Sequence, residues 1–99
     1  MAFSHKAHIT WSKEHFDRGL PAVTELIDPA WFGEEIVAGK EGWSLVCTFD
    51  SPLNTSPNPV AARVRFMVGN APHEQLKAGT RLWLAQRGGR GYARVEVLD

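Results

Sequence analysis

Two central segments, residues 43–50 and 60–68, alternate between apolar and polar side chains, and this alternation constrains the fold more than any other feature. The apolar side of the first segment carries Trp43, Leu45, Cys47 and Phe49, and that of the second carries Val60, Ala62, Val64, Phe66 and Val68. Successive side chains of a β-strand point to opposite faces, so a period of two indicates a strand with one buried face. We therefore predict an all-β fold with these residues in its core.

Further strands are expected on both sides of this centre. Residues 80–87 and 91–98 flank the turn-forming Gly88-Gly89-Arg90 and predict a C-terminal hairpin. Its second strand has Ala93, Val95 and Val97 as the inward set and Tyr92, Arg94 and Glu96 as the outward set. Residues 7–12 alternate in the same way, and an apolar piece at 22–27 predicts one more strand.

Segments rich in turn residues separate these strands, namely Asp28-Pro29 and residues 39–42, 51–59 and 69–79. Only residues 72–77 are expected to hold a helical turn. The chain has 99 residues, 43% of them hydrophobic and 22% charged, which fits one domain over residues 1–99 in which residues 1–5 can remain disordered. Six short strands in so small a domain favour a closed antiparallel β-barrel, because closure leaves no long unpaired edge.

The sequence carries few signals for chemistry. The Gly-rich loops that bind nucleotide phosphates are absent, so we expect no cofactor. His5, His8 and His15 lie near one another in the sequence, but strand residues three apart point to opposite faces, so we expect no metal site. Cys47 follows the inward pattern and is read as a small core residue and not a nucleophile. Catalysis would need an acid–base pair such as Glu25 with His8. The spacing of residues in the sequence does not indicate such a pair, so we expect that the protein is not an enzyme.

Cysteine content and hydropathy bear on location. The single cysteine excludes an internal disulfide, no stretch approaches the ~20 apolar residues of a membrane span, and the first residues lack a secretory signal. These features favour a cytoplasmic protein that has no membrane partner.

Charge is divided unevenly along the chain although the net charge is zero. Residues 1–50 carry four Lys/Arg and eight acids, a balance of −4, and residues 51–99 carry seven and three, a balance of +4. Around the predicted hairpin lie Arg81, Trp83, Arg87, Arg90, Tyr92 and Arg94. Arginines bind phosphates and aromatic rings stack on bases, so this cluster suits RNA. The alternative is a solvated face whose arginines pair with acids.

Two segments resemble one family. Residues 12–21, Ser-Lys-Glu-His-Phe-Asp-Arg-Gly-Leu-Pro, look like the opening of the C-terminal β-barrel domain of elongation factor Tu. Residues 81–97, centred on Gln86-Arg87-Gly88-Gly89-Arg90, are similar to the last hairpin of that domain. The resemblance implies a six-stranded antiparallel barrel and a contact with tRNA. On this chain the contact would be made by Arg87, Gly88, Gly89 and Arg90, where glycines allow the backbone to approach phosphates closely.

The resemblance also implies a register for residues 80–87. Trp83 and Ala85 would point into the barrel, and Leu82 and Leu84 would lie on the outside. Such an apolar outer patch needs a cover, which predicts a docking site for a second copy or a protein partner. The sequence thus favours a non-catalytic module that binds tRNA or other structured RNA, with a protein–protein adaptor as the alternative and a small enzyme third. It leaves the identity of the ligand and the oligomeric state open.

Overall fold

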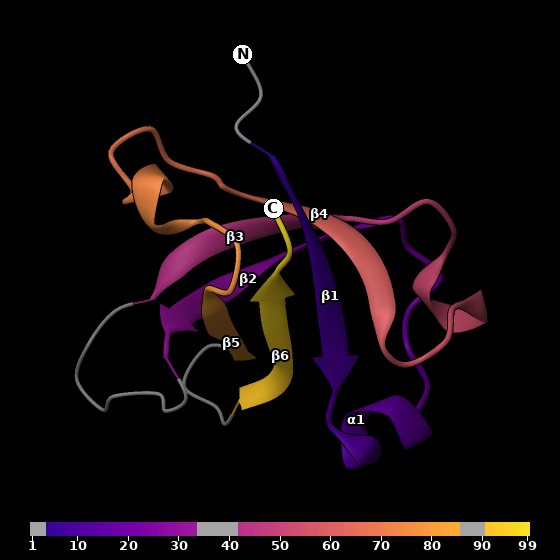
Figure 1. Ribbon diagram of the computed structural model, residues 1–99. Coiled ribbons are helices and arrows are strands. Elements are labelled where there is room, and N and C mark those ends of the chain that lie inside the picture. Colours follow the sequence, from indigo (N-terminus) through magenta and orange to yellow (C-terminus); the bar gives the residue numbers. More distant parts are fainter. Residues whose placement is uncertain (1–3, 34–41, 86–90) are drawn as a thin grey trace.

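The computed structural model describes residues 4–33, 42–85 and 91–99, which form a barrel of antiparallel strands closed in the order β1-β4-β3-β2-β5-β6 (Figure 1). The strands are β1 His5–Trp11, β2 Glu25–Phe32, β3 Trp43–Thr48, β4 Val60–Phe66, β5 Arg81–Ala85 and β6 Gly91–Val97. Each strand pairs with two antiparallel neighbours. The predicted all-β class and the closed six-stranded barrel are confirmed.

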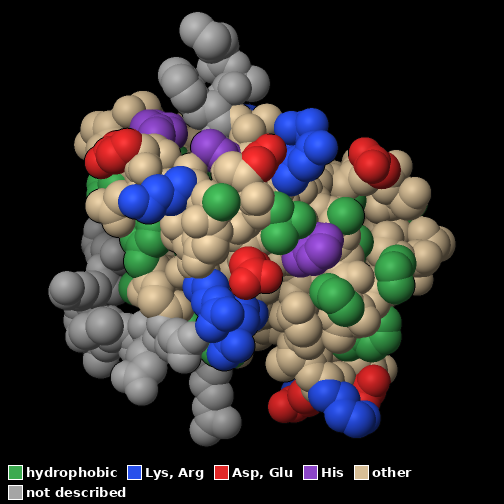
Figure 2. All heavy atoms as spheres, in the orientation of Figure 1, with side chains coloured by type: hydrophobic (Ala, Val, Ile, Leu, Met, Phe, Trp, Pro, Cys, Tyr) green, Lys and Arg blue, Asp and Glu red, His purple; other side chains and the backbone are tan. Residues whose placement is uncertain are grey.

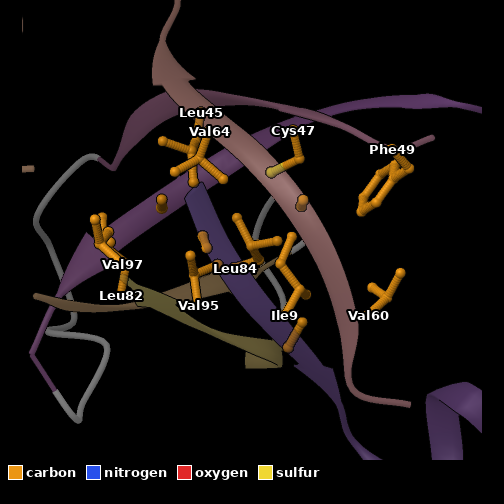
Figure 3. Packing of buried hydrophobic residues seen from close by; sticks show 14 of the residues in the cluster. Ile9, Leu45, Cys47, Phe49, Val60, Val64, Leu82, Leu84, Val95 and Val97 are labelled. Carbon is orange, nitrogen blue, oxygen red and sulfur yellow. The ribbon is translucent and has the colours of Figure 1, made fainter. Parts of the chain in front are cut away.

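The barrel is filled by the apolar sides that the alternation predicted (Figure 3). Val68 is the exception, because it lies beyond the end of β4 and is 36% exposed. Phe49, Val64, Phe66 and Val95 are buried, and Trp43 is half-buried and packs against the same core. Burial alternates perfectly along β4, where every second side chain from Val60 to Phe66 is buried. Period two therefore predicted the core face of β4 correctly because its outward positions are polar or small.

The described residues also form three short helices between the strands: α1 Lys13–Asp17 and the 3-10 turns η1 Leu53–Thr55 and η2 His73–Gln75. Helix α1 follows the end of β1 (Figure 1) and begins where the Ser12 hydroxyl accepts a hydrogen bond of 3.2 Å from the His15 amide. It ends before Gly19, whose φ of 93° suits a residue without a Cβ. The prediction that only residues 72–77 could hold a helical turn is wrong, because Ser12 supplies an N-cap.

The expected register of β5 is wrong. Leu82 and Leu84 are 0% exposed and point into the barrel, whereas Trp83 is half-buried on the outer face. Leu84 lies opposite Ala30 on β2 and Ala93 on β6, which are both buried, and paired residues share a face of the sheet. Leu82 and Leu84 therefore cannot form the outer docking patch. Ala85 is buried as well, at a register shift between β5 and β6.

The second strand differs from the prediction in its position. Asp28-Pro29, expected in a turn, lies in the middle of β2, and the segment at 22–27 overlaps β2 only from Glu25 onward. Strand β5 pairs with β2 only at Ala30–Phe32, so Pro29 loses no ladder hydrogen bond on that side. Asp28 lies opposite the buried Leu45 and so faces inward.

Candidate functional site

The strands of the barrel carry unequal charge. Four strands that are neighbours in the order β5-β6-β1-β4 contain five Lys or Arg side chains, all on exposed positions: Lys6, Arg63, Arg65, Arg81 and Arg94. Their residue ranges contain one carboxylate, that of Glu96. The ranges of β2 and β3 contain no Lys or Arg and two acids, Glu25 and Asp28. We call the outer face of β5, β6, β1 and β4 the basic face.

The pairing register brings cations from distant parts of the sequence together on the basic face. Lys6 lies opposite Arg63, and Arg94 lies opposite both Thr10 and Trp83. The guanidinium carbon of Arg94 is 4.9 Å from the centre of the Trp83 ring, a cation–π arrangement. In Figure 2, Lys/Arg and His side chains lie over the side of the molecule where β1, β4 and β6 are in front, with acidic side chains among them.

Acidic groups neutralise only part of this face. A nitrogen of Arg81 lies 3.6 Å from the Glu96 carboxylate, with both side chains about half exposed. Two hollows open on the face, one of about 460 Å³ beside Lys6 and Arg63 and one of about 280 Å³ beside Arg81 and Arg94. Asp50 lines the first hollow and Glu96 the second. Each hollow therefore places two cations beside one carboxylate.

The structure brings together some of the sequence-predicted RNA-binding residues. Arg81, Trp83 and Arg94 lie on the basic face, and sequence reasoning missed its other cations, Lys6, Arg63 and Arg65. The signal for Lys6 was its outward position in an alternating strand, but its neighbours depend on the order of strands in the barrel. The predicted contacts Arg87, Gly88, Gly89 and Arg90 lie outside the described residues.

Tyr92 was expected on the outer face, and this expectation is wrong. Leu84 pairs with Ala93 but Ala85 pairs with Gly91, so Tyr92 is an extra residue in β6. Such a bulge breaks the alternation and turns the side chain toward the interior, where Tyr92 is 8% exposed. Its hydroxyl donates a hydrogen bond to the Asp28 carboxylate on β2. Burial, and next the hydrogen bond to Asp28, raise the pKa of Tyr92 well above its ordinary range.

A cavity of about 120 Å³, here called the end cavity, lies beside this hydrogen bond. Its polar and aromatic walls are Trp11, His15, Asp28 and Tyr92, and its remaining described walls are Leu20, Pro21, Leu26 and Leu53. The Trp11 and Tyr92 rings stack with centres 6.0 Å apart, and the His15 ring lies 4.6 Å from that of Tyr92. Trp11 is 3% exposed, and its Nε1 is buried with no hydrogen-bond partner among the described residues.

The other titratable candidates are placed as follows. Cys47 is 0% exposed, and burial together with the charge of Asp28 raises the pKa of its thiol well above the ordinary range, so it stays protonated at neutral pH. Glu25 and His8 lie on β2 and β1, which are not neighbours in the barrel, so they do not form an acid–base pair. Among the described residues no group of three His, Cys, Asp or Glu side chains is placed to hold a metal.

Comparisons with protein-family models, with curated proteins and with solved structures return no match for this chain. In the described part of the chain, every helix is too short or too polar to cross a membrane.

Proposed function

We propose that this barrel is a non-catalytic binding module for structured RNA such as tRNA, held through the basic face. The observation that carries the proposal is the placement of Lys6, Arg63, Arg65, Arg81 and Arg94 on four neighbouring strands whose only carboxylate is that of Glu96. A rigid surface of this kind attracts the phosphate backbone because arginines donate two parallel hydrogen bonds to phosphate oxygens. Phosphate contacts position the RNA without reading its sequence.

An aromatic ring on β5, at one side of the basic face, favours nucleic acid over other anions. Trp83 is half-buried, and the Arg94 guanidinium lies against its ring. An unstacked base in an RNA loop can stack on an indole or on a guanidinium plane. Trp83 and Arg94 therefore offer a stacking surface within the array of phosphate-binding cations.

The resemblance to the C-terminal barrel domain of elongation factor Tu supports the same ligand class. Arg87-Gly88-Gly89-Arg90 connects β5 to β6, the two strands that carry Arg81 and Arg94. A contact of that segment with tRNA would thus extend the basic face. We keep the relation to that family, a role in translation and a cytoplasmic location as proposals.

Two competing interpretations differ in what they predict. The solvated-face alternative relies on pairs such as Arg81 with Glu96, but an exposed pair is worth only about 0–1 kcal/mol and does not prevent Arg81 from binding phosphate. The adaptor alternative used Leu82 and Leu84, which are buried, so it has no described docking surface of that kind. A protein partner or a second copy is therefore an outcome of the experiment below and not the proposal.

The proposal is tested by titrating fluorescent tRNA with the protein at low salt and measuring anisotropy. We expect binding at micromolar protein and a steep loss of affinity as salt rises. Arg63→Gln and Arg94→Gln should each weaken binding and lower the slope of log K against log salt by about 1. Lys13→Gln is the matched control, because it removes the same charge from a side chain that is 90% exposed on α1 and is not part of the four strands of the basic face.

No binding at micromolar protein, or an equal effect of Lys13→Gln and Arg63→Gln, would refute the proposal. Purification from the native cell provides a second test. RNA that accompanies the protein and is released by salt supports the proposal, and a stoichiometric protein partner without RNA supports the adaptor alternative instead.

A further inference from the structure

The basic face is wide compared with the barrel that carries it. Its four strands follow one another in the order β5-β6-β1-β4, and β2 and β3 complete the closed ring (Figure 1). The edge strands β5 and β4 are therefore equally far apart in both directions around the ring, on opposite sides of the barrel. Arg81 on β5 and Arg63 and Arg65 on β4 consequently belong to a surface that curves around the wall from one side to the other.

The two hollows of the basic face lie along this curve. The first contains Lys6 and Arg63, and the second contains Arg81 and Arg94. His8 on β1 lines both hollows, because it lies opposite a residue of the first hollow on β4 and opposite a residue of the second on β6. An anionic chain that follows the wall therefore meets two cations in each of two neighbouring hollows.

Three side chains with flat groups lie in one row at the second hollow. Arg94 lies opposite Trp83, and Trp83 lies opposite Trp31 on β2, so the three share the outer face. Both indoles are half-buried and Arg94 is exposed, with its guanidinium carbon 4.9 Å from the centre of the Trp83 ring. The Trp83 ring thus supports an exposed guanidinium group. An unpaired base can stack on such a group, whereas the bases of a stem are already stacked inside it.

We propose that the basic face binds an unpaired segment of RNA, such as a loop or a single-stranded tail, and not a base-paired stem. This inference rests on the proposed RNA binding and states which part of the RNA makes the contact. A double helix is stiff over many base pairs, so it touches a convex wall along one line and leaves the cations of the far strand without phosphates. A single strand bends around the wall, so its phosphates enter both hollows while a base stacks on Arg94.

One RNA strand, free and paired, separates the two kinds of contact. The probe is an unstructured, fluorescently labelled RNA of about 12 nucleotides, within the roughly 4–16 nucleotides that a barrel of the OB type covers. Its affinity at low salt is measured by anisotropy before and after annealing to its complement. Annealing doubles the number of phosphates, so attraction by charge alone favours the duplex. We expect instead that the free strand binds at least fivefold more tightly.

A strand of the same length with an abasic site in place of every base tests the stacking contribution. This strand keeps the phosphates and the flexibility of the normal one. It should bind at least fivefold more weakly, because no base remains to stack on Arg94.

Variants test the assigned guanidinium group. Arg94→Lys keeps the charge but removes the planar group, so it should weaken binding of the free strand at least threefold and leave duplex binding unchanged. Arg65→Lys is the matched control, because Arg65 is also exposed on the basic face but lies opposite Val46 and not opposite an aromatic residue. It should change neither affinity more than twofold.

Equal or tighter binding of the duplex, equal binding of the abasic strand, or equal effects of the two variants on the free strand overturns the inference. Such a result leaves the proposed RNA binding intact, because the probes still bind. Absence of binding by every probe refutes both the inference and the proposed function. The comparison of probes on the natural sequence decides the inference even if a variant does not fold.

Discussion

Leu84 is the residue whose replacement tests the register of β5 most directly. It is 0% exposed, and its cross-strand neighbours are Ala30 and Ala93, two of the smallest side chains in the core. Alanines cannot extend into the space that Leu84→Ala would leave, so most of the cavity should persist. Leu→Ala substitutions in cores cost about 2–5 kcal/mol and rise with residual cavity volume, which places this variant at about 3–4 kcal/mol.

Urea unfolding followed by circular dichroism measures this cost. With a slope of about 1.5–2 kcal/mol per M urea, the midpoint should fall by about 2 M. Ile27→Ala is the control, because Ile27 is 44% exposed on β2, and it should cost less than about 1 kcal/mol. The double substitution Leu82→Ser and Leu84→Ser should prevent folding, because its cost approaches the whole stability of a small domain, roughly 5–15 kcal/mol.

The opposite register makes the opposite prediction. If Trp83 and Ala85 filled the barrel and Leu84 lay outside, Leu84→Ala would cost no more than Ile27→Ala, and the double serine variant would fold. Either result would refute the inward position of Leu84 and would restore an apolar patch on the outer face.

Three further results are expected. Folding raises the pKa of Cys47 and of Tyr92 above their ordinary values of 9.0 and 10.0, so the unfolded chain loses these protons at a lower pH than the folded protein. The free energy of unfolding should therefore fall as pH rises above about 9, by up to about 1.4 kcal/mol per pH unit for each group. Urea midpoints at pH 7, 9 and 10.5 test this, and a constant midpoint contradicts it. Tyr92→Phe should cost about 1–3 kcal/mol in the same assay by removing the donor to Asp28, whereas an unchanged midpoint would show that the hydrogen bond adds nothing. Cys47 should react with a thiol reagent only after unfolding, and rapid reaction of the native protein would contradict its 0% exposure.

The parts of the fold that could be predicted are those where one strand face is clearly polar. On β4, Arg63 and Arg65 mark the outward side without ambiguity. On β5, the run from Leu82 to Ala85 is apolar on both faces, so periodicity cannot choose between them. Only the partners of β5, Ala30 and Ala93 among them, determine which side is inward, and these are contacts between distant parts of the sequence.

The end cavity could not be predicted from the sequence for a similar reason. Asp28-Pro29 is a strong local turn signal, but it lies in a strand that pairs with Ser44 and Leu45 on β3. Tyr92 continues a regular alternation in the sequence, and the bulge that turns it inward is defined by the pairing of Ala85 with Gly91. The local sequence pattern determines neither the strand register nor the position of the bulge.

Part of the basic face could be predicted from the sequence. The second half of the chain has the excess of arginine, and three of the four strands of the basic face come from that half. Mixing of the halves in a barrel could have neutralised this charge. It does not, because β1 is the one strand of the first half inserted there, and it brings Lys6 and no acid, while the two acids in the ranges of β2 and β3, Glu25 and Asp28, both belong to β2.

The bulge in β6 links the two candidate sites to one structural cause. Arg94 and Tyr92 are two residues apart, and in a regular strand both would lie on the basic face. With the extra residue, Arg94 stays outside against Trp83 while Tyr92 turns inward to Asp28. Without this bulge the Asp28 carboxylate would lose its hydrogen-bond donor, and the end cavity would lose one aromatic wall. The cationic outer face and the aromatic wall of the end cavity therefore both depend on a single extra residue in β6.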